Sequence, residues 1–94
     1  MEVIIKPKAQ KALSLIATFV EERNTPQSGL RYIEKFASKI KIYAKENVQY
    51  SLCNNITLST LGYSCITISK WVVVFKIQNQ KFVVYRIIWG ALLN

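Results

Sequence analysis

The sequence of 94 residues contains no histidine and only two cysteines, and charged side chains interrupt its apolar runs. Two thiols without an imidazole fall short of the four ligands of an ordinary zinc site within one chain, so we expect no metal, and no pattern indicates a cofactor. The longest apolar stretches contain Lys76, Lys81 or Arg86 and are shorter than the roughly 20 residues of a membrane-spanning helix. The sequence therefore predicts neither a metalloprotein nor a membrane protein.

The N-terminus also lacks the features of a secretory signal. Its apolar run, Val3 to Ile5, is too short, and it starts with an acid instead of a basic cluster. We therefore expect a cytoplasmic protein. Disulfides are rare in that compartment, so Cys53 and Cys65 are expected to be reduced thiols.

Acidic side chains are scarce and unevenly distributed. Thirteen basic and five acidic side chains give a net charge of +8. No acidic side chain follows Glu46, whereas four cations do: Lys70, Lys76, Lys81 and Arg86. A field of this sign attracts a polyanion, either nucleic acid or an acidic protein segment. Solvated lysines without a partner would give the same pattern.

The C-terminal third, Gly62 to Asn94, is rich in β-branched and aromatic residues. It is broken only at Ser69-Lys70 and at Gln78 to Lys81, which predicts three antiparallel strands. The middle strand is apolar on both faces: Trp71, Val73, Phe75 and Ile77 point to one side, and Val72, Val74 and Lys76 to the other. Such a strand is central, so the N-terminal half must cover it.

That half predicts a short strand, Val3 to Ile5, ended by Pro7, and then two helices. The first helix stops near Asn24. The second takes Thr25 as its N-cap and Pro26 as its first residue, and ends at about Glu46. The first apolar stripe is Ala9, Ala12, Leu13, Ile16, Ala17 and Val20, and the second is Leu30, Ile33, Phe36, Ala37, Ile40, Tyr43 and Ala44.

Residues 47–61 are irregular, with an additional short strand predicted to start at Leu52 or Ile56. The predicted fold is a single α+β domain over residues 1–94. It consists of an N-terminal strand, a helical hairpin and a three- to four-stranded antiparallel sheet, whose edge the N-terminal strand is free to join.

This order of elements resembles the RelE/ParE family of toxins from bacterial type II toxin-antitoxin modules, which serve in plasmid stabilization. Three local patterns carry the resemblance. Tyr50-Ser-Leu-Cys and Leu58 to Tyr63 are similar to the family's "Y-P-L … L-G-Y-R". Lys70 to Ile77 is similar to "N-Y-x-V-F-Y-R-V", and Phe82 to Ala91 to "V-x-V-L-R-I-L-H-G-A".

The chain departs from the family pattern at four positions. Ser64 stands where the family has arginine, Trp89 where it has histidine, and Leu92 and Leu93 where it has arginine and aspartate. In ribosome-dependent nuclease members, basic and aromatic side chains position the phosphate and assist attack by the ribose 2'-hydroxyl. The side chains left here for such chemistry are Lys70, Lys76, Arg86, Tyr63 and Tyr85.

These candidates also have ordinary structural roles. Arg86 matches a family position and could hold a phosphate through its two-pronged guanidinium, or it could pack along the sheet or pair with a partner's carboxylate. Lys70 at a tight turn is typically solvated, and Lys76 must extend to solvent or find a partner. Trp71 is expected in the core. Trp89 could pack there or stack on a base.

The resemblance implies a toxin that a cognate acidic antitoxin neutralises, in an assembly such as a heterotetramer. The depleted nuclease set favours the ParE-like branch, which poisons DNA gyrase through protein contact, or a toxin whose activity has decayed. The alternatives are a RelE-like endoribonuclease acting on mRNA at the ribosome and a non-toxic basic nucleic-acid-binding module. Expected contact residues for target or antitoxin are Lys70, Lys76, Lys81, Arg86 and Trp89, next to the apolar ending Ile87 to Leu93.

Overall fold

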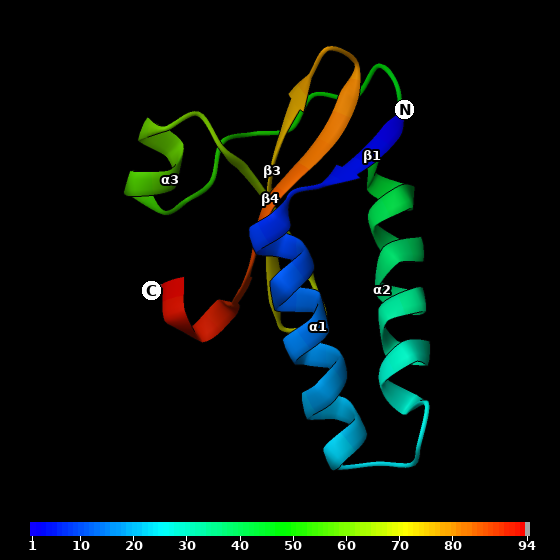
Figure 1. The fold of residues 1–94 in the computed structure, drawn as a ribbon. Helices are drawn as coiled ribbons and strands as arrows, with labels where there is room; N and C mark the ends of the chain where they lie inside the picture. The colour runs from blue at the N-terminus through cyan, green and yellow to red at the C-terminus, as the bar shows by residue number, and fades with distance from the viewer. Residues whose placement is uncertain (94) are drawn as a thin grey trace.

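The computed structural model describes residues 1–93, which form a helical hairpin packed on a four-stranded sheet (Figure 1). The elements in chain order are β1 (Glu2–Ile5), α1 (Pro7–Glu22), α2 (Ser28–Tyr43), α3 (Ile56–Thr60), β2 (Ser64–Ile68), β3 (Trp71–Gln78), β4 (Lys81–Trp89) and the 3-10 turn η1 (Gly90–Leu93). The predicted α+β architecture is confirmed. None of these helices has the length and apolarity needed to cross a membrane.

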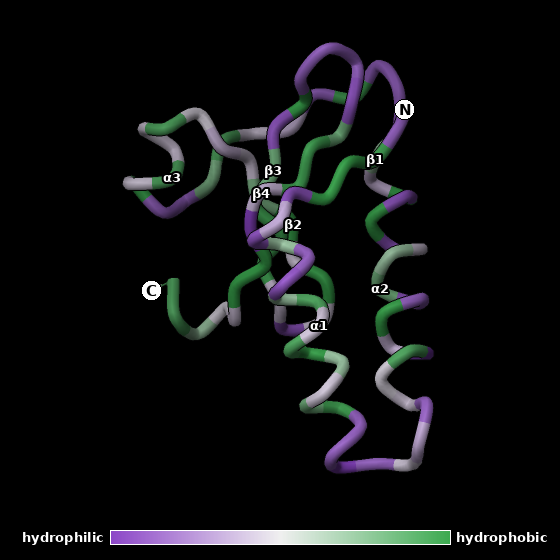
Figure 2. The backbone as a smooth tube through the Cα atoms, viewed as in Figure 1, coloured by the Kyte–Doolittle hydropathy of each residue, from purple (hydrophilic) through white to green (hydrophobic). Residues whose placement is uncertain are grey.

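The sheet has the strand order β1-β4-β3-β2. Strands β2, β3 and β4 form the predicted antiparallel meander. Strand β1 joins its edge as expected, but it runs parallel to β4, from the pair Glu2 and Lys81 to the pair Ile5 and Val84. The sheet is therefore mixed, not wholly antiparallel. Figure 2 shows the strands largely hydrophobic and the β3–β4 turn hydrophilic.

The two faces of β3 are both covered, as its sequence predicts. Val73 and Phe75 belong to the core beneath the helices, whereas Val74 points to the opposite face and is also fully buried. Ile77 leaves this pattern because it lies near the end of the strand and is exposed. Phe75 pairs with Val84 and Val74 pairs with Arg86, so Tyr85 is an extra residue that forms a bulge in β4.

The core lies between the helical hairpin and the sheet. Both helices contribute most of their predicted apolar stripes, and α1 and α2 cross closely at Gly29. The prediction is wrong for Leu30, which lies in the first turn of α2 and is 59% exposed. A Cβ at this position would lie 2.3 Å from the main-chain oxygen of Ala17. The principal buried side chains are Ala9, Leu13 and Ile16 of α1, Phe36 and Ile40 of α2, and Ile66, Phe75, Phe82, Val84 and Ile87 of the sheet.

Several predicted boundaries are wrong. Helix α2 begins at Ser28 and not after Thr25, because Gln27 adopts a left-handed conformation with φ of 70° that interrupts the helix. It ends at Tyr43, three residues before Glu46, since Ala44 leaves the helical region with ψ of 51°. Pro7 is the first residue of α1, where its missing N–H costs no hydrogen bond.

The irregular segment 47–61 contains a short helix. Leu52 pairs with Ser64 in an isolated antiparallel bridge, so an extended residue lies where one was predicted. Ile56, in contrast, starts α3 and not a strand. The side chain of Asn55 accepts a hydrogen bond of 3.1 Å from the Leu58 amide and caps this helix.

The expectation of two reduced thiols is also wrong for this structure, because Cys53 and Cys65 form a disulfide. The backbone brings the two segments together: besides the bridge at Leu52, the Cys53 amide donates a 2.9 Å hydrogen bond to the Tyr63 carbonyl. Sequence spacing could not reveal this approach, because it depends on how the 53–63 loop folds back on β2.

Candidate functional site

The C-terminal half of β4 lies at an open edge of the sheet. Strand β1 pairs with β4 only as far as Val84, and the Lys6 amide donates the last hydrogen bond, of 2.9 Å, to the Val84 carbonyl. Pro7 then turns the chain into α1. Among residues 1–93, no strand pairs with Tyr85 to Trp89 on that side.

Main-chain groups of β4 face this open edge. The Gly90 amide donates to the Lys70 carbonyl and therefore points toward the rest of the sheet. Because peptide groups alternate in direction along a strand, those of Ile87 and Trp89 point the other way. The open edge thus offers hydrogen-bond donors and acceptors to another chain.

An apolar groove of about 600 Å³ runs between this edge and α1. Four consecutive residues of β4 line it, so the groove follows the side of the strand. Its lining residues are Ala12, Leu15, Ile16 and Phe19 of α1, Trp71 of β3, Arg86, Ile87, Ile88 and Trp89 of β4, and Leu92 of η1. Three of the large apolar side chains are more than half exposed: Leu15 (63%), Phe19 (52%) and Leu92 (75%). Exposed apolar patches of this kind are typical of binding sites.

The charges at the groove are positive. Arg86 lines it, and the guanidinium of Arg23 lies 3.7 Å from the centre of the Phe19 ring. Within residues 1–93, the single ion pair joins Lys81 and Glu2 at 3.7 Å, away from this groove. Among the residues that the structure describes, Arg23 and Arg86 have no carboxylate partner. They therefore suit an apolar segment that carries acidic side chains.

The two tryptophans lie together beside the groove. Their rings meet edge to face with centroids 5.0 Å apart. Trp71 packs on the core, as the sequence indicates, while Trp89 keeps 38% of its surface exposed. Trp89 thus supplies a partly exposed aromatic surface to the groove.

A second cluster of cations and aromatic rings lies on the sheet face opposite the helices. The Lys76 ammonium is 4.5 Å from the centre of the Tyr63 ring, and the Lys6 ammonium is 5.9 Å from that of Tyr85. The two rings meet edge to face at 5.3 Å. The Tyr85 hydroxyl donates to the side-chain oxygen of Gln78 at 2.5 Å.

This arrangement unites part of the predicted nuclease set. Tyr63, Lys76 and Tyr85 lie together, and Arg86 follows Tyr85 at the bulge. Lys70 lies in the β2–β3 turn near Gly90, and Lys81 lies at the other end of β4 beside Glu2. The predicted contact residues are therefore spread along the sheet instead of forming one patch.

Sequence reasoning missed the α1 side of the groove. Leu15, Phe19 and Arg23 lie at four-residue spacing, outside the apolar stripe that faces the core. Two large apolar residues on the expected solvent side of an amphipathic helix were the available signal. That these two residues line a groove becomes clear only from the position of β4 beside α1.

Comparisons with known proteins agree with this fold. A family model described as the ParE toxin of the type II toxin-antitoxin system, parDE, matches residues 3–91. A solved structure described as the chromosomal ParDE TA system from P. aeruginosa is similar with a TM-score of 0.70. That likeness has 15% sequence identity and covers 95% of each chain, so it speaks for the fold alone. No curated protein matches the sequence.

Proposed function

This chain belongs to the ParE toxin family of type II toxin-antitoxin systems, and on that premise we propose that it arrests growth by binding DNA gyrase until a cognate antitoxin neutralises it. Family membership supports the toxin role and an antitoxin partner. Gyrase as the target rests on the resemblance to the ParE-like branch.

The groove between α1 and β4 is the observation that carries the antitoxin part of the proposal. It combines exposed Leu15, Phe19 and Leu92 with two arginines and with a strand edge that no strand within residues 1–93 pairs with. An antitoxin tail with apolar side chains flanked by Asp or Glu would bury these exposed apolar side chains. Its carboxylates would pair with the two arginines, and its main chain would hydrogen-bond to the edge of β4. We propose that this groove receives such a tail.

Action by protein contact fits the residues on the other face of the sheet. Proton transfer from a ribose hydroxyl and to the leaving oxygen calls for well-placed acids and bases. The cluster of Tyr63, Lys76 and Tyr85 contains neither imidazole nor carboxylate, and the Tyr85 hydroxyl is engaged by Gln78. Binding a protein target requires none of these groups.

The test is controlled induction in a bacterial host. We expect growth arrest, induction of the DNA damage response and intact mRNA, and we expect co-expression of the cognate antitoxin to restore growth. In vitro, the purified chain should inhibit supercoiling by gyrase. Unimpaired growth would argue against an active toxin.

The ribonuclease alternative keeps one supporting observation, the proximity of Lys76 to Tyr63 and of Tyr63 to Tyr85. It predicts mRNA cleavage when the chain is added to a translation reaction. It also predicts that the Lys76→Ala and Arg86→Ala variants lose this cleavage. Arrest that survives both substitutions with intact mRNA favours protein contact.

A further inference from the structure

The segment between the two cysteines is only weakly packed. Its helix, α3, has five residues and buries none of them. Ile56 is 79% exposed and Leu61 is 58% exposed. A helix of this length has little stability of its own, so its position depends on how the segment is attached.

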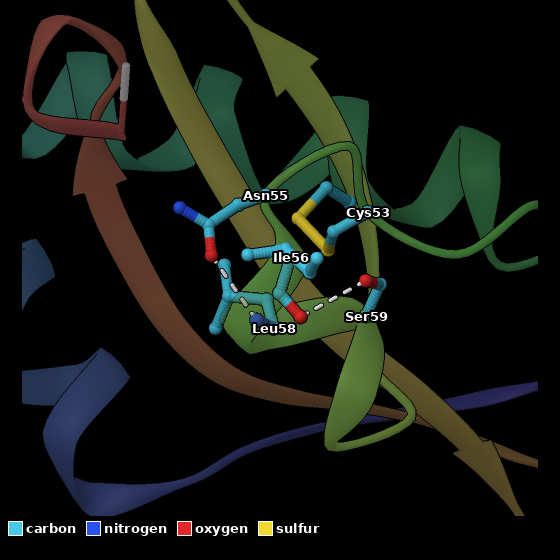
Figure 3. The surroundings of a disulfide bond; sticks show 6 residues. Cys53, Asn55, Ile56, Leu58 and Ser59 are labelled. Carbon is cyan, nitrogen blue, oxygen red and sulfur yellow. Dashed lines mark hydrogen bonds between the residues drawn. A yellow bond between two sulfur atoms is a disulfide. The ribbon is translucent and has the colours of Figure 1, made fainter.

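The attachments lie at the base of the loop. They are the Cys53–Cys65 disulfide, the bridge between Leu52 and Ser64, and the hydrogen bond from the Cys53 amide to the Tyr63 carbonyl. Within the loop, Asn55 caps Leu58 and the Ser59 hydroxyl donates to the Ile56 carbonyl (Figure 3). These internal bonds shape the loop but do not hold it to the sheet.

The loop is fastened to the sheet face opposite the helical hairpin. Cys65 pairs in register with Val74, which points away from the hairpin core. The end of the loop carries Tyr63, whose ring contacts Lys76 and Tyr85. The position of the loop therefore determines how far Tyr63 covers Lys76, and so how accessible this cationic face of the sheet is.

The disulfide can be approached from outside. A hollow of about 550 Å³ between the loop and η1 is lined by both cysteines, together with Thr67, Val72 and Leu93. Cys53 is 5% exposed and Cys65 is half-buried, so we take attack at Cys65 as the open route. A small dithiol can enter the hollow and reach Cys65.

We propose that the Cys53–Cys65 bond is a redox-controlled tether for the loop of residues 53–63. A thiolate of a dithiol reductant attacks the Cys65 sulfur, and a mixed disulfide forms as the Cys53 thiolate leaves. The second thiolate of the reductant then displaces Cys65. Two electrons and two protons pass to the chain, which ends with two thiols, and the reductant ends as a disulfide.

Oxidation by a disulfide reverses these steps and docks the loop again. In the reduced state the loop loses its covalent link, Tyr63 moves away from Lys76, and the cationic face opens. This control acts on a surface other than the α1–β4 groove, so it does not depend on antitoxin binding there.

Hydrogen exchange of the full chain, with and without excess dithiothreitol, tests the tether. We expect amides of residues 54–64 to exchange at least ~10-fold faster after reduction, while those of β3 and β4 keep their protection. Unchanged exchange in the loop would overturn the proposal. Equal loss of protection throughout the sheet would do so as well, because the bond would then stabilise the whole fold.

The matched control is the Cys53→Ser, Cys65→Ser double variant. Its loop amides should exchange as fast as those of the reduced chain, with or without dithiothreitol. A second measurement on the unaltered chain avoids dependence on the folding of this variant. Acetylation of Lys76 by an amine-reactive reagent should rise several-fold on reduction, while Lys39, exposed on α2 on the hairpin side of the sheet, should react at a constant rate. A constant rate at Lys76 would contradict the opening of the face.

Discussion

At the scale of single residues, Tyr50 ties the segment after α2 to the core. Its hydroxyl donates a 2.6 Å hydrogen bond to the Tyr43 carbonyl, and its ring meets Phe75 edge to face at 5.3 Å. Tyr50→Phe keeps the ring and removes the donor. We expect the free energy of unfolding to fall by about 1 kcal/mol, measured by urea denaturation at neutral pH.

The same residue should make the stability of the fold decrease at alkaline pH. Burial, and secondly the neighbouring Tyr43, raise the pKa of Tyr50 above its ordinary value of 10.0. The folded state thus favours the neutral phenol, so its contribution is complete below pH 10 and is lost as the pH rises through the raised pKa. Tyr50→Phe should flatten this decline. Parallel curves for the two proteins above that pH would contradict the assignment.

At the scale of elements, the crossing of α1 and α2 depends on Gly29. An added Cβ would lie 2.3 Å from the Ala17 carbonyl oxygen, and main chain cannot move aside as a flexible side chain does. Alanine favours the helix by about 1 kcal/mol over glycine, but we expect the clash to outweigh this gain. Gly29→Ala should therefore destabilise the fold by roughly 1–3 kcal/mol, measured as a lower Tm.

Ser38→Ala is the matched control in the same helix. Ser38 is exposed and its hydroxyl bonds only to the Glu34 carbonyl one turn earlier. We expect a change within about 0.5 kcal/mol. If Gly29→Ala were more stable than the unaltered chain, helix propensity would dominate and the two helices could separate at little cost.

At the scale of the whole molecule, the groove is assembled from both ends of the chain, since α1 forms one wall and β4 with η1 the other. Phe19→Ser combined with Leu92→Ser removes apolar surface that is already exposed. We expect little change in stability. The affinity for the cognate antitoxin should fall by roughly 2 kcal/mol, about 30-fold in Kd, measured by calorimetry.

Ile56→Ser is the control for this prediction. Ile56 is the most exposed of the large apolar side chains and lies on α3, outside the groove. Its substitution should leave antitoxin affinity unchanged. If Ile56→Ser weakened antitoxin binding as much as the double substitution does, the antitoxin would bind on the other side of the sheet and not in the groove.

Much of the architecture could be predicted from local patterns. Alternation of apolar residues and the polar breaks at Ser69 and Gln78 predicted β2, β3 and β4, because strands and turns of a meander are neighbours in sequence. Three- and four-residue spacing predicted the two helices. The start of α2 was missed, since the left-handed conformation of Gln27 has no strong local signal.

The amino-acid order alone was enough for the class of fold, the family and the charge asymmetry, because each can be inferred from composition, from local periodicity or from short motifs. Three-dimensional packing settled three other features: the parallel docking of β1 on β4, the groove beside the open half of that strand, and the Cys53–Cys65 bond. Each joins segments that are spatial neighbours only once the hydrophobic core has formed, and the free energy of that core, not the local sequence, brings them together.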